Sequence, residues 1–276
     1  MDVERVRSFN RTVTERVGAL QDSYLGSDRP LGADRVLWEI GDGTDLRALR
    51  NRLELDSGYL SRLIGALQKE GLVETAPGAD KRVREVRLTE AGTAERAILD
   101  RRSDELAAAL LAPLSRAQRE RLVDAMGTVE RLLTAGLVEI AEEDPASADA
   151  RFCLREYYAE LDARFDDGFE LGRTLPSDDA VLLIARLRGQ PVGCGAIKVA
   201  ESSIKRMWVS PAARGLGVGR RLLGELEQRS RTGIARLETN RNLTEAIALY
   251  RAAGYVEVEP FNDEPYAHHW FEKRLC

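Results

Sequence analysis

Apolar positions recur at spacings of three and four through the first half of the chain, which is the period of amphipathic helices. Between residues 4 and 24 the apolar stripe consists of Val6, Phe9, Val13, Val17 and Leu20. The same pattern predicts further helices over 33–40, 46–53, 59–70, 91–111 and 115–137. Residues 72–75 and 83–88 have the composition of two short strands around a turn. The first half is therefore predicted to be mainly helical, with one β-hairpin.

The pattern changes after an acidic stretch, residues 139–149, that contains Pro145. A helix is predicted over 151–165, followed by a loop with Gly168, Gly172 and Pro176. Beyond this loop, strands are predicted over 180–187, 192–199, 203–209, 235–239, 255–259 and 268–273, with helices after Gly219 and over 243–253. Such an order of helices and strands predicts an α/β domain. We therefore expect two domains, residues 1–145 and 146–276.

Composition limits the class of protein. The 276 residues suffice for two cores, and the fractions of 43% hydrophobic and 32% charged residues are typical of globular proteins. No apolar run approaches the roughly 18 residues of a membrane span, and the charged start does not resemble an export signal. We therefore expect a cytoplasmic protein with no membrane association. Cys153, Cys194 and Cys276 have no metal-ligand spacing, so reduced thiols and no metal are expected.

The helices predicted over 46–53 and 59–70 are joined by the short segment Glu54-Leu55-Asp56-Ser57. The second helix has a polar face formed by Ser57, Tyr59, Ser61 and Arg62. Two short helices joined in this way predict a helix-turn-helix, and the hairpin that follows would be its wing. Although the net charge of the chain is −5, residues 77–88 hold four basic and two acidic side chains. A modest, salt-dependent affinity for phosphates is expected there.

Four segments of the first half resemble the MarR family of bacterial regulators: Leu60-Ser61-Arg62-Leu63, residues 69–73, Asp80-Lys81-Arg82 and residues 86–92. The resemblance covers about residues 1–141 and implies a homodimer on palindromic double-stranded DNA. It implies base contacts by Ser57, Tyr59, Ser61 and Arg62 and a minor-groove contact by Arg82. Lys81 and Arg84 of the hairpin are expected to contact DNA beside it. The long helices over 91–111 and 115–137 would form the dimer.

The most specific chemical pattern lies between Met207 and Leu223. An apolar run ends at Val209, glycines follow at 215, 217 and 219, and an apolar helical pattern then begins. Glycines let a backbone approach a ligand closely, and free N–H groups at a helix start favour a phosphate. Residues 205–221 include five basic side chains and no acidic one. A polyphosphate ligand is therefore predicted, although neither the dinucleotide fingerprint nor the Walker loop is matched.

This stretch resembles motif A of the GNAT N-acetyltransferases, R/Q-x-x-G-x-G/A, matched here by Arg214, Gly217 and Gly219. The resemblance covers about residues 151–275 and implies an acyl-CoA N-acyltransferase fold with a mixed, largely antiparallel sheet. It implies acetyl-CoA as co-substrate, and a pyrophosphate bound by Arg214, Gly215, Leu216, Gly217, Val218, Gly219 and Arg220. The backbone N–H groups of Trp208 and Val209, beside Met207, would hold the acetyl carbonyl.

Acetyl transfer to an amine needs a base for the ammonium proton and an acid for the leaving thiolate. Asn242, Ala246, Tyr250, Gly254 and Tyr255 resemble the family pattern N-x-x-x-A-x-x-x-Y-x-x-x-G-F/Y. This resemblance implies that Tyr250 is the acid and that Asn242 contacts CoA.

The base is less clear from the sequence. Residues 203–209 contain no carboxylate, so Glu238 on the next strand is the first choice, acting directly or through a water. A structural ion pair of Glu238 is the alternative. His268 and His269 are adjacent, so at most one could face a cleft.

The sequence as a whole therefore predicts a DNA-binding regulator fused to an acetyltransferase that acts on a primary amine, either a small molecule or a protein lysine. Transfer would occur by direct attack in a ternary complex. Two alternatives stay open. The second domain could bind acetyl-CoA as a signal without turnover, or the winged helix could serve only to dimerise an enzyme. The acceptor depends on the loops over 165–178 and 260–267.

Overall fold

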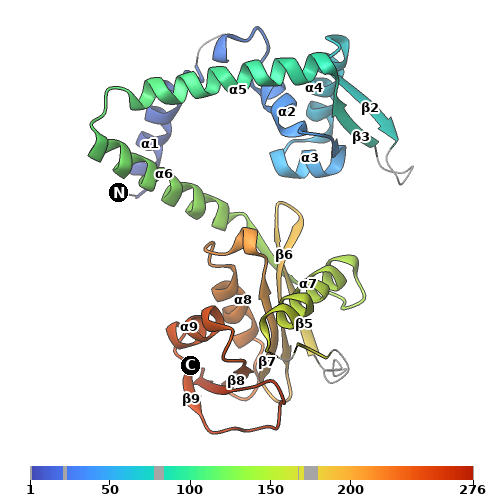
Figure 1. The fold of residues 1–276 in the computed structure, drawn as a ribbon, viewed down its shortest axis with the longest axis vertical. Helices are drawn as coiled ribbons and strands as arrows, with labels where there is room; N and C mark the ends of the chain where they lie inside the picture. Colours follow the sequence, from blue (N-terminus) through green and yellow to red (C-terminus); the bar gives the residue numbers. More distant parts are fainter. Residues whose placement is uncertain (1, 21–23, 78–83, 167, 171–179, 276) are drawn as a thin grey trace. The chain divides into compact units, whose positions relative to one another are not determined.

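The computed structural model describes residues 2–20, 24–77, 84–166, 168–170 and 180–275. The chain divides into two compact units, Met1–Ala125 and Met126–Cys276. Each unit has its own hydrophobic core, as the length of the chain predicts. Figure 1 labels the elements of both units, and each unit is considered separately below.

The first unit is mainly helical. Its elements are α1 (Asp2–Arg16), η1 (Tyr24–Gly26), α2 (Leu31–Ile40), β1 (Thr44–Asp45), α3 (Leu46–Leu53), α4 (Ser57–Lys69), β2 (Val73–Pro77), β3 (Arg84–Leu88), α5 (Glu90–Leu111) and the start of α6 (Arg116–Gly136). The three strands form one sheet in the order β1-β3-β2. A core of aliphatic side chains from α2, α3, α4 and β3 holds the unit together. This arrangement confirms the predicted winged helix-turn-helix.

Several boundaries in this unit differ from the sequence prediction, and two of them have a clear local cause. Helix α1 ends at Arg16 rather than near residue 24, because Gly18 adopts a positive φ of 70°. Helix α4 begins at Ser57 rather than Tyr59, because the Asp56 carboxylate caps it by accepting a hydrogen bond from the Tyr59 N–H. The Asp45 side chain caps α3 in the same way. Strand β1 was not predicted, since a two-residue strand has no hydrophobic period.

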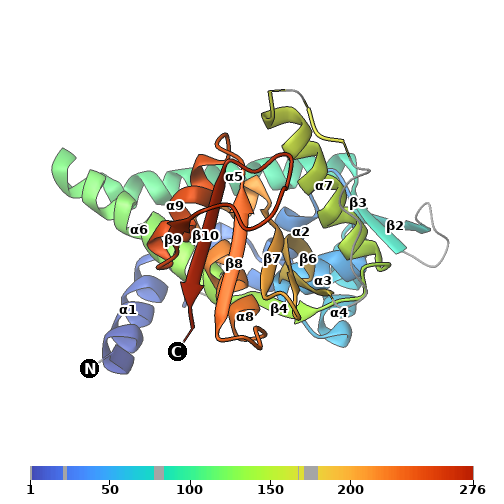
Figure 2. The same cartoon turned by 90° about the horizontal axis from the view of Figure 1, so that it is seen from below.

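The second unit contains a seven-stranded sheet. Its elements are β4 (Val138–Glu142), α7 (Ala148–Arg164), β5 (Ala180–Leu187), β6 (Gln190–Lys198), β7 (Ser203–Val209), η3 (Pro211–Ala213), α8 (Val218–Glu227), β8 (Ile234–Thr239), α9 (Thr244–Ala252), β9 (Val256–Val258) and β10 (His269–Arg274). The strand order is β4-β5-β6-β7-β8-β10-β9. Every neighbouring pair is antiparallel except β7 with β8. Figure 2 shows β7, β8 and β10 side by side. The predicted mixed, largely antiparallel fold is confirmed.

Strand β4 lies where the sequence predicts an acidic joint. Val138 pairs with Leu187, and Glu142 pairs with Leu183. Val138 is buried, whereas Glu139 and Glu142 are exposed. Residues 138–142, which precede the domain boundary predicted between 145 and 146, thus form an edge strand of the second sheet.

The helices cover both faces of this sheet. Side chains alternate between the faces of a strand, so Leu182 and Ile184 of β5 pack toward α7, whereas Leu183 and Ala185 pack toward α8. Helix α9 shares the core on the α8 face through Ile247 and Tyr250.

Strands β7 and β8 share only a short parallel pairing. Ser203 pairs with Arg236, and no further pair follows along these two fully described strands. The pairing of β6 with β7 also shifts register after Cys194, and Arg206 adopts a left-handed φ of 53°. The cavities described below lie at the carboxyl ends of β7 and β8, beyond their short pairing.

Candidate active site

A groove of about 540 Å³ follows the end of β7 and the start of α8. Nine of the residues predicted to bind acetyl-CoA line it: Met207, Trp208, Val209, Arg214, Gly215, Gly217, Val218, Gly219 and Arg220. Its other walls come from α7 and α9, including Tyr157, Glu160, Leu249 and Tyr250. The structure therefore brings the glycine-rich loop and Tyr250 to one groove.

The glycines of the loop have different physical roles. Gly215 and Gly217 adopt φ values of 81° and 77°, a region that strains any residue with a Cβ. Gly219 has an ordinary φ, but a Cβ there would lie 3.3 Å from the Leu249 side chain. Helix α8 begins after Gly217 with no side-chain cap, so the N–H groups of its first turn have no partner within the helix. These N–H groups and the positive end of the helix dipole can bind a phosphate group.

Arg214 is held by Glu160 of α7. One terminal nitrogen of Arg214 donates to both Glu160 carboxylate oxygens, at 2.7 and 2.6 Å, and its Nε donates to the Val209 carbonyl at 3.1 Å. Glu160 also accepts from Trp208 Nε1 at 3.0 Å and from Arg164 at 3.2 Å. Glu160 thus fixes three donors around the groove. The sequence analysis missed it, since a glutamate on an amphipathic helix gives no local signal.

Two of the predicted CoA-binding residues do not line the groove. The Leu216 side chain packs against the core below α8. The Asn242 side-chain amide donates to the Arg164 backbone carbonyl at 2.8 Å and to Asp166 at 3.3 Å, and the Asn242 backbone carbonyl accepts from the Arg164 guanidinium at 2.6 Å. The side chain of Asn242 therefore ties the end of α7 to the start of α9. The predicted contact of Asn242 with CoA stays a prediction, and the Asn242 amide already donates to Arg164 and Asp166.

Tyr250 of α9 is buried and borders both the groove and a second cavity. Burial, and then the negative charge of Glu238, raise its pKa well above the ordinary value. The phenol therefore stays protonated at neutral pH. Tyr157 of α7 borders the same two cavities, and burial raises its pKa as well. The apolar pattern of α7 places Tyr157 in the core but does not distinguish this position.

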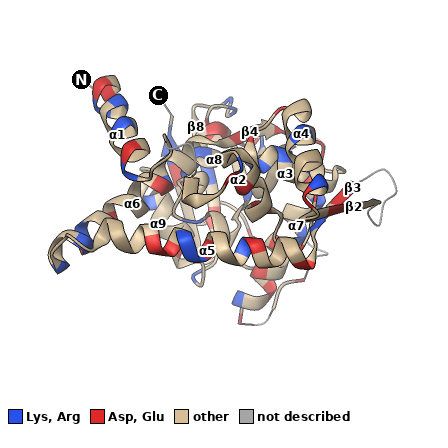
Figure 3. Cartoon of the chain, turned by 90° about the horizontal axis from the view of Figure 1, so that it is seen from above, with Lys and Arg blue, Asp and Glu red and all other residues tan. Residues whose placement is uncertain are grey.

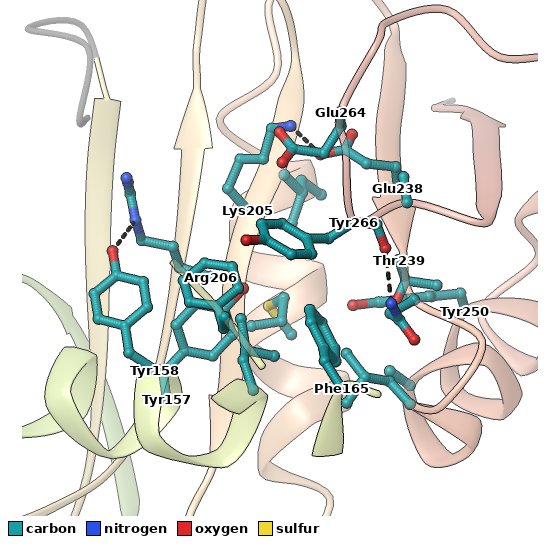
Figure 4. A pocket seen from close by; sticks show the side chains of 18 of the residues that line it. Tyr157, Tyr158, Phe165, Lys205, Arg206, Glu238, Thr239, Tyr250, Glu264 and Tyr266 are labelled. Carbon is teal, nitrogen blue, oxygen red and sulfur yellow. Dashed lines mark hydrogen bonds and ion pairs between the residues drawn. The ribbon is translucent and has the colours of Figure 1, made fainter. Parts of the chain in front are cut away.

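The second cavity has a volume of about 200 Å³ and lies between α7, the ends of β7 and β8, and residues 264–267 (Figure 4). It shares six residues with the groove: Tyr157, Leu161, Met207, Leu243, Ala246 and Tyr250. A ligand in the groove and a ligand in this cavity would therefore meet beside Tyr250.

Glu238 lines this second cavity and forms an ion pair with Lys205. Its carboxylate accepts from the Lys205 ammonium and, at 3.4 Å, from the Asn262 amide. The side chain of Glu238 is only 6% exposed. The structure thus contains the ion pair that the sequence left as an alternative, and the role of Glu238 as a base stays a prediction. Neither histidine lines either cavity: His269 contacts Glu257 at 2.6 Å, and His268 donates its backbone N–H to Thr239.

Among the described residues, no group of three or more potential ligands from His, Cys, Asp and Glu could hold a metal ion. Within the same ranges, no helix has the length and apolar character needed to cross a bilayer. Cys153 and Cys194 are free and buried between α7 and the sheet.

The first unit has a groove of about 300 Å³ between α3, α4 and the hairpin. Of the residues predicted to contact DNA, Ser57, Ser61 and Arg84 line it, and Lys81 and Arg82 lie outside the described residues. Tyr59 and Arg62 lie on a different stripe of α4, where the Arg62 guanidinium sits 5.6 Å from the Tyr59 ring centre. Arg47 and Arg50 of α3 also line the groove and were missed, because the sequence analysis considered only the second helix and the hairpin.

Comparison with known proteins agrees with both halves of this description. A model of the winged helix DNA-binding domain matches residues 34–92, and a model of the acetyltransferase (GNAT) domain matches residues 178–257. The N-alpha-acetyltransferase RimI of Mycobacterium tuberculosis is 35% identical over an alignment of 123 positions, and the match covers 40% of this chain and 75% of that protein. The chain belongs to the GNAT acetyltransferases.

Its GNAT part is also similar to a protein named IAA acetyltransferase from Azospirillum brasilense, with 42% identity over 96 residues. That match covers 32% of this chain and 63% of the relative, so the chain spans less than two thirds of it. The solved structure of MarR from Escherichia coli is 24% identical, with a TM-score of 0.40, and the match covers 45% of this chain and 93% of that one.

Proposed function

We propose that the GNAT unit transfers an acetyl group from acetyl-CoA to a primary amine, and that the winged-helix unit binds DNA as a homodimer. The observation that carries the first part is the meeting of two cavities at Tyr250. One cavity is bordered by the glycine loop and the start of α8, and the other contains Glu238. Two relatives that are named acetyltransferases support the same reaction class.

Each residue has a chemical task in this reaction. The N–H groups at the start of α8 and the Arg214 guanidinium bind the pyrophosphate. The backbone N–H groups of Trp208 and Val209 bind the acetyl carbonyl and stabilise its developing negative charge. Glu238 accepts a proton from the amine, directly or through a water, and Tyr250 donates its proton to the leaving thiolate. The amine attacks the thioester directly in the ternary complex.

Titration calorimetry with CoA and acetyl-CoA, followed by a thiol-release assay against a panel of amines, tests the enzymatic part. Tyr250→Phe should retain CoA binding and lose turnover. The control is Tyr255→Phe, because Tyr255 is also buried but lines neither cavity. Equal rates for Tyr250→Phe and the wild type would rule out the assigned acid.

A regulator that binds acetyl-CoA without turnover remains a second candidate, favoured by one observation. The Glu238 carboxylate already accepts hydrogen bonds from both Lys205 and Asn262, so two donors compete with an incoming amine for it. Heat of binding with acetyl-CoA, combined with no thiol release for any amine, would support this candidate.

Exposed apolar residues support the homodimer. On α1, Val6 and Phe9 are 56% and 46% exposed, and on α6, Leu132 and Leu133 are 69% and 67% exposed. No residue of either helix is buried in the single chain. Apolar stripes of this kind are stabilised by a partner. Sedimentation velocity should therefore find a dimer, whereas a monomer at micromolar concentration would contradict the proposal.

The basic groove at α3 and α4 supports DNA binding, because Arg47, Arg50 and Arg84 line it together with polar residues of α4. By contrast, acidic and basic side chains are interspersed along α5 (Figure 3). A mobility shift of the protein's own promoter fragment, weakened by salt and lost in Arg82→Ala, is the direct test. Dimerisation without any shift would leave the winged helix only a structural role.

A further inference from the structure

The cavity that contains Glu238 has a wall of aromatic rings. Phe169 lies between Tyr158 and Tyr266, with ring centres 5.7 and 4.9 Å away, and Phe165 packs edge-on against it at 5.9 Å. Figure 4 shows Tyr158, Phe165 and Tyr266 around the same space. The cavity volume of about 200 Å³ is below the range of roughly 300–1,000 Å³ that is typical of drug-sized ligands. A small occupant with a flat apolar part fits this wall.

The same cavity contains a cation that can bind an anion. The Lys205 ammonium has three N–H donors, and within the described part of the chain it donates a hydrogen bond to Glu238. The Lys205 side chain is 22% exposed and lines the cavity. Lys198 also lines the cavity, but its ammonium lies 3.8 Å from the Glu201 carboxylate. A ligand carboxylate can therefore accept a hydrogen bond from a Lys205 N–H that Glu238 does not use.

We propose that the acetyl acceptor is a small aromatic amine that also carries a carboxylate, such as an aromatic α-amino acid. This inference rests on the proposed acetyl transfer. The ring of the acceptor packs against Phe169 and its neighbours, the carboxylate binds Lys205, and the amine lies toward Tyr250. In the reaction, the N–C bond forms and the C–S bond of the thioester breaks. The amine proton goes to Glu238, directly or through a water, and the thiolate takes the Tyr250 proton.

Matched amines separate the three recognition elements. L-Phenylalanine has all three, phenethylamine lacks the carboxylate, L-leucine lacks the ring, and a lysine-containing peptide represents a protein acceptor. Calorimetry should show L-phenylalanine binding to the CoA-saturated protein at least tenfold more tightly than each of the others. In the thiol-release assay with acetyl-CoA, kcat/KM should follow the same order.

Lys205→Met should bring the kcat/KM ratio of L-phenylalanine to phenethylamine down toward one, and Lys205→Arg should retain most of it. Because this ratio compares two amines in the same variant, a general loss of activity affects both values of kcat/KM and leaves the ratio unchanged. Lys273→Met is the matched control, because Lys273 pairs with Glu227, is 25% exposed and lines neither cavity.

Every other outcome contradicts either the assigned acceptor or the proposed acetyl transfer. Preference for phenethylamine, L-leucine or the peptide would overturn the assignment, as would an unchanged ratio in Lys205→Met. Binding of CoA without binding of any of the amines would also overturn it. No heat with CoA itself would instead refute the proposed acetyl transfer.

Discussion

The Arg214 guanidinium and the Glu160 carboxylate form a two-oxygen contact across the groove that acetyl-CoA is proposed to occupy. Arg214 stands at the first position of the pyrophosphate-binding pattern, so its guanidinium has two competing anionic partners. The phosphate would have to share Arg214 with Glu160 or displace Glu160. The carboxylate on α7 therefore opposes binding of an anionic ligand.

Glu160→Gln should bind CoA about two- to fivefold more tightly, because removing the carboxylate charge frees Arg214 and reduces repulsion. Arg214 is 42% exposed, and a contact of this exposure contributes about 1 kcal/mol at most. Calorimetry at two salt concentrations measures the effect, which should shrink at high salt. Glu156→Gln, one turn earlier on α7 and outside the groove, is the control. Weaker binding in Glu160→Gln would show that the carboxylate supports the site.

Gly217→Ala should weaken CoA binding at least tenfold and cost about 1 kcal/mol of unfolding free energy, because Gly217 has a φ of 77° that a Cβ disfavours. Gly224→Ala is the control on the same helix. Gly224 lies inside α8, a Cβ there meets nothing within 4 Å, and alanine should stabilise it by about 0.5–1 kcal/mol. Chemical denaturation and calorimetry give both numbers. Unchanged affinity for CoA in Gly217→Ala would show that the backbone conformation of the loop does not contribute to CoA binding.

Stability should fall at alkaline pH. Burial raises the pKa values of Tyr157, Tyr250 and Tyr255 in the folded chain, so their contribution is fully present below the unfolded tyrosine pKa of about 10. It is lost as the pH rises toward their folded values, because the unfolded chain releases these protons first. Tyr250→Phe should make this decline shallower by up to about 1.4 kcal/mol per pH unit. Urea denaturation between pH 8 and about 11 measures the slope.

Arg29→Met should destabilise the winged-helix unit by about 3 kcal/mol, because it leaves the buried Asp34 carboxylate without its partner at 2.7 Å. Arg29 also contacts Glu70 and Glu95, so three acidic groups lose a counter-charge. Arg35→Met is the control and should cost less than 1 kcal/mol, since Arg35 is 57% exposed and Glu39 keeps its contact with Arg52 at 3.1 Å. Similar losses of unfolding free energy in both variants would mean that the buried ion pairs of Arg29 stabilise the unit no more than an exposed pair does.

Arg47→Ala should weaken DNA binding and reduce the slope of log K against log salt by about one, as expected for one lost phosphate contact. Arg62→Ala tests the other face of α4, where the guanidinium lies over Tyr59. Arg101→Ala on α5, paired with Glu105 and outside the groove, is the control. Fluorescence anisotropy at several salt concentrations distinguishes these effects. A larger loss in Arg62→Ala than in Arg47→Ala would assign the DNA contact to the face of α4 that bears Tyr59.

The sequence by itself determined the features that depend on near neighbours. Helix period predicted α2, α3 and α4, glycine spacing predicted the loop that begins α8, and two family patterns predicted both folds. These features follow from local backbone geometry and from the burial of one face, which a short window of residues encodes.

The tertiary structure alone decided which distant residues meet. It paired Lys205 with Glu238, placed Glu160 on Arg214, turned Asn242 toward α7, and added β4 to the sheet. Each of these relationships joins segments that are distant along the chain. No residue pattern predicts the left-handed φ of Arg206 or the register shift between β6 and β7. Side-chain partners across such a sheet are set by strand order and register, and these become definite only when the whole chain has packed.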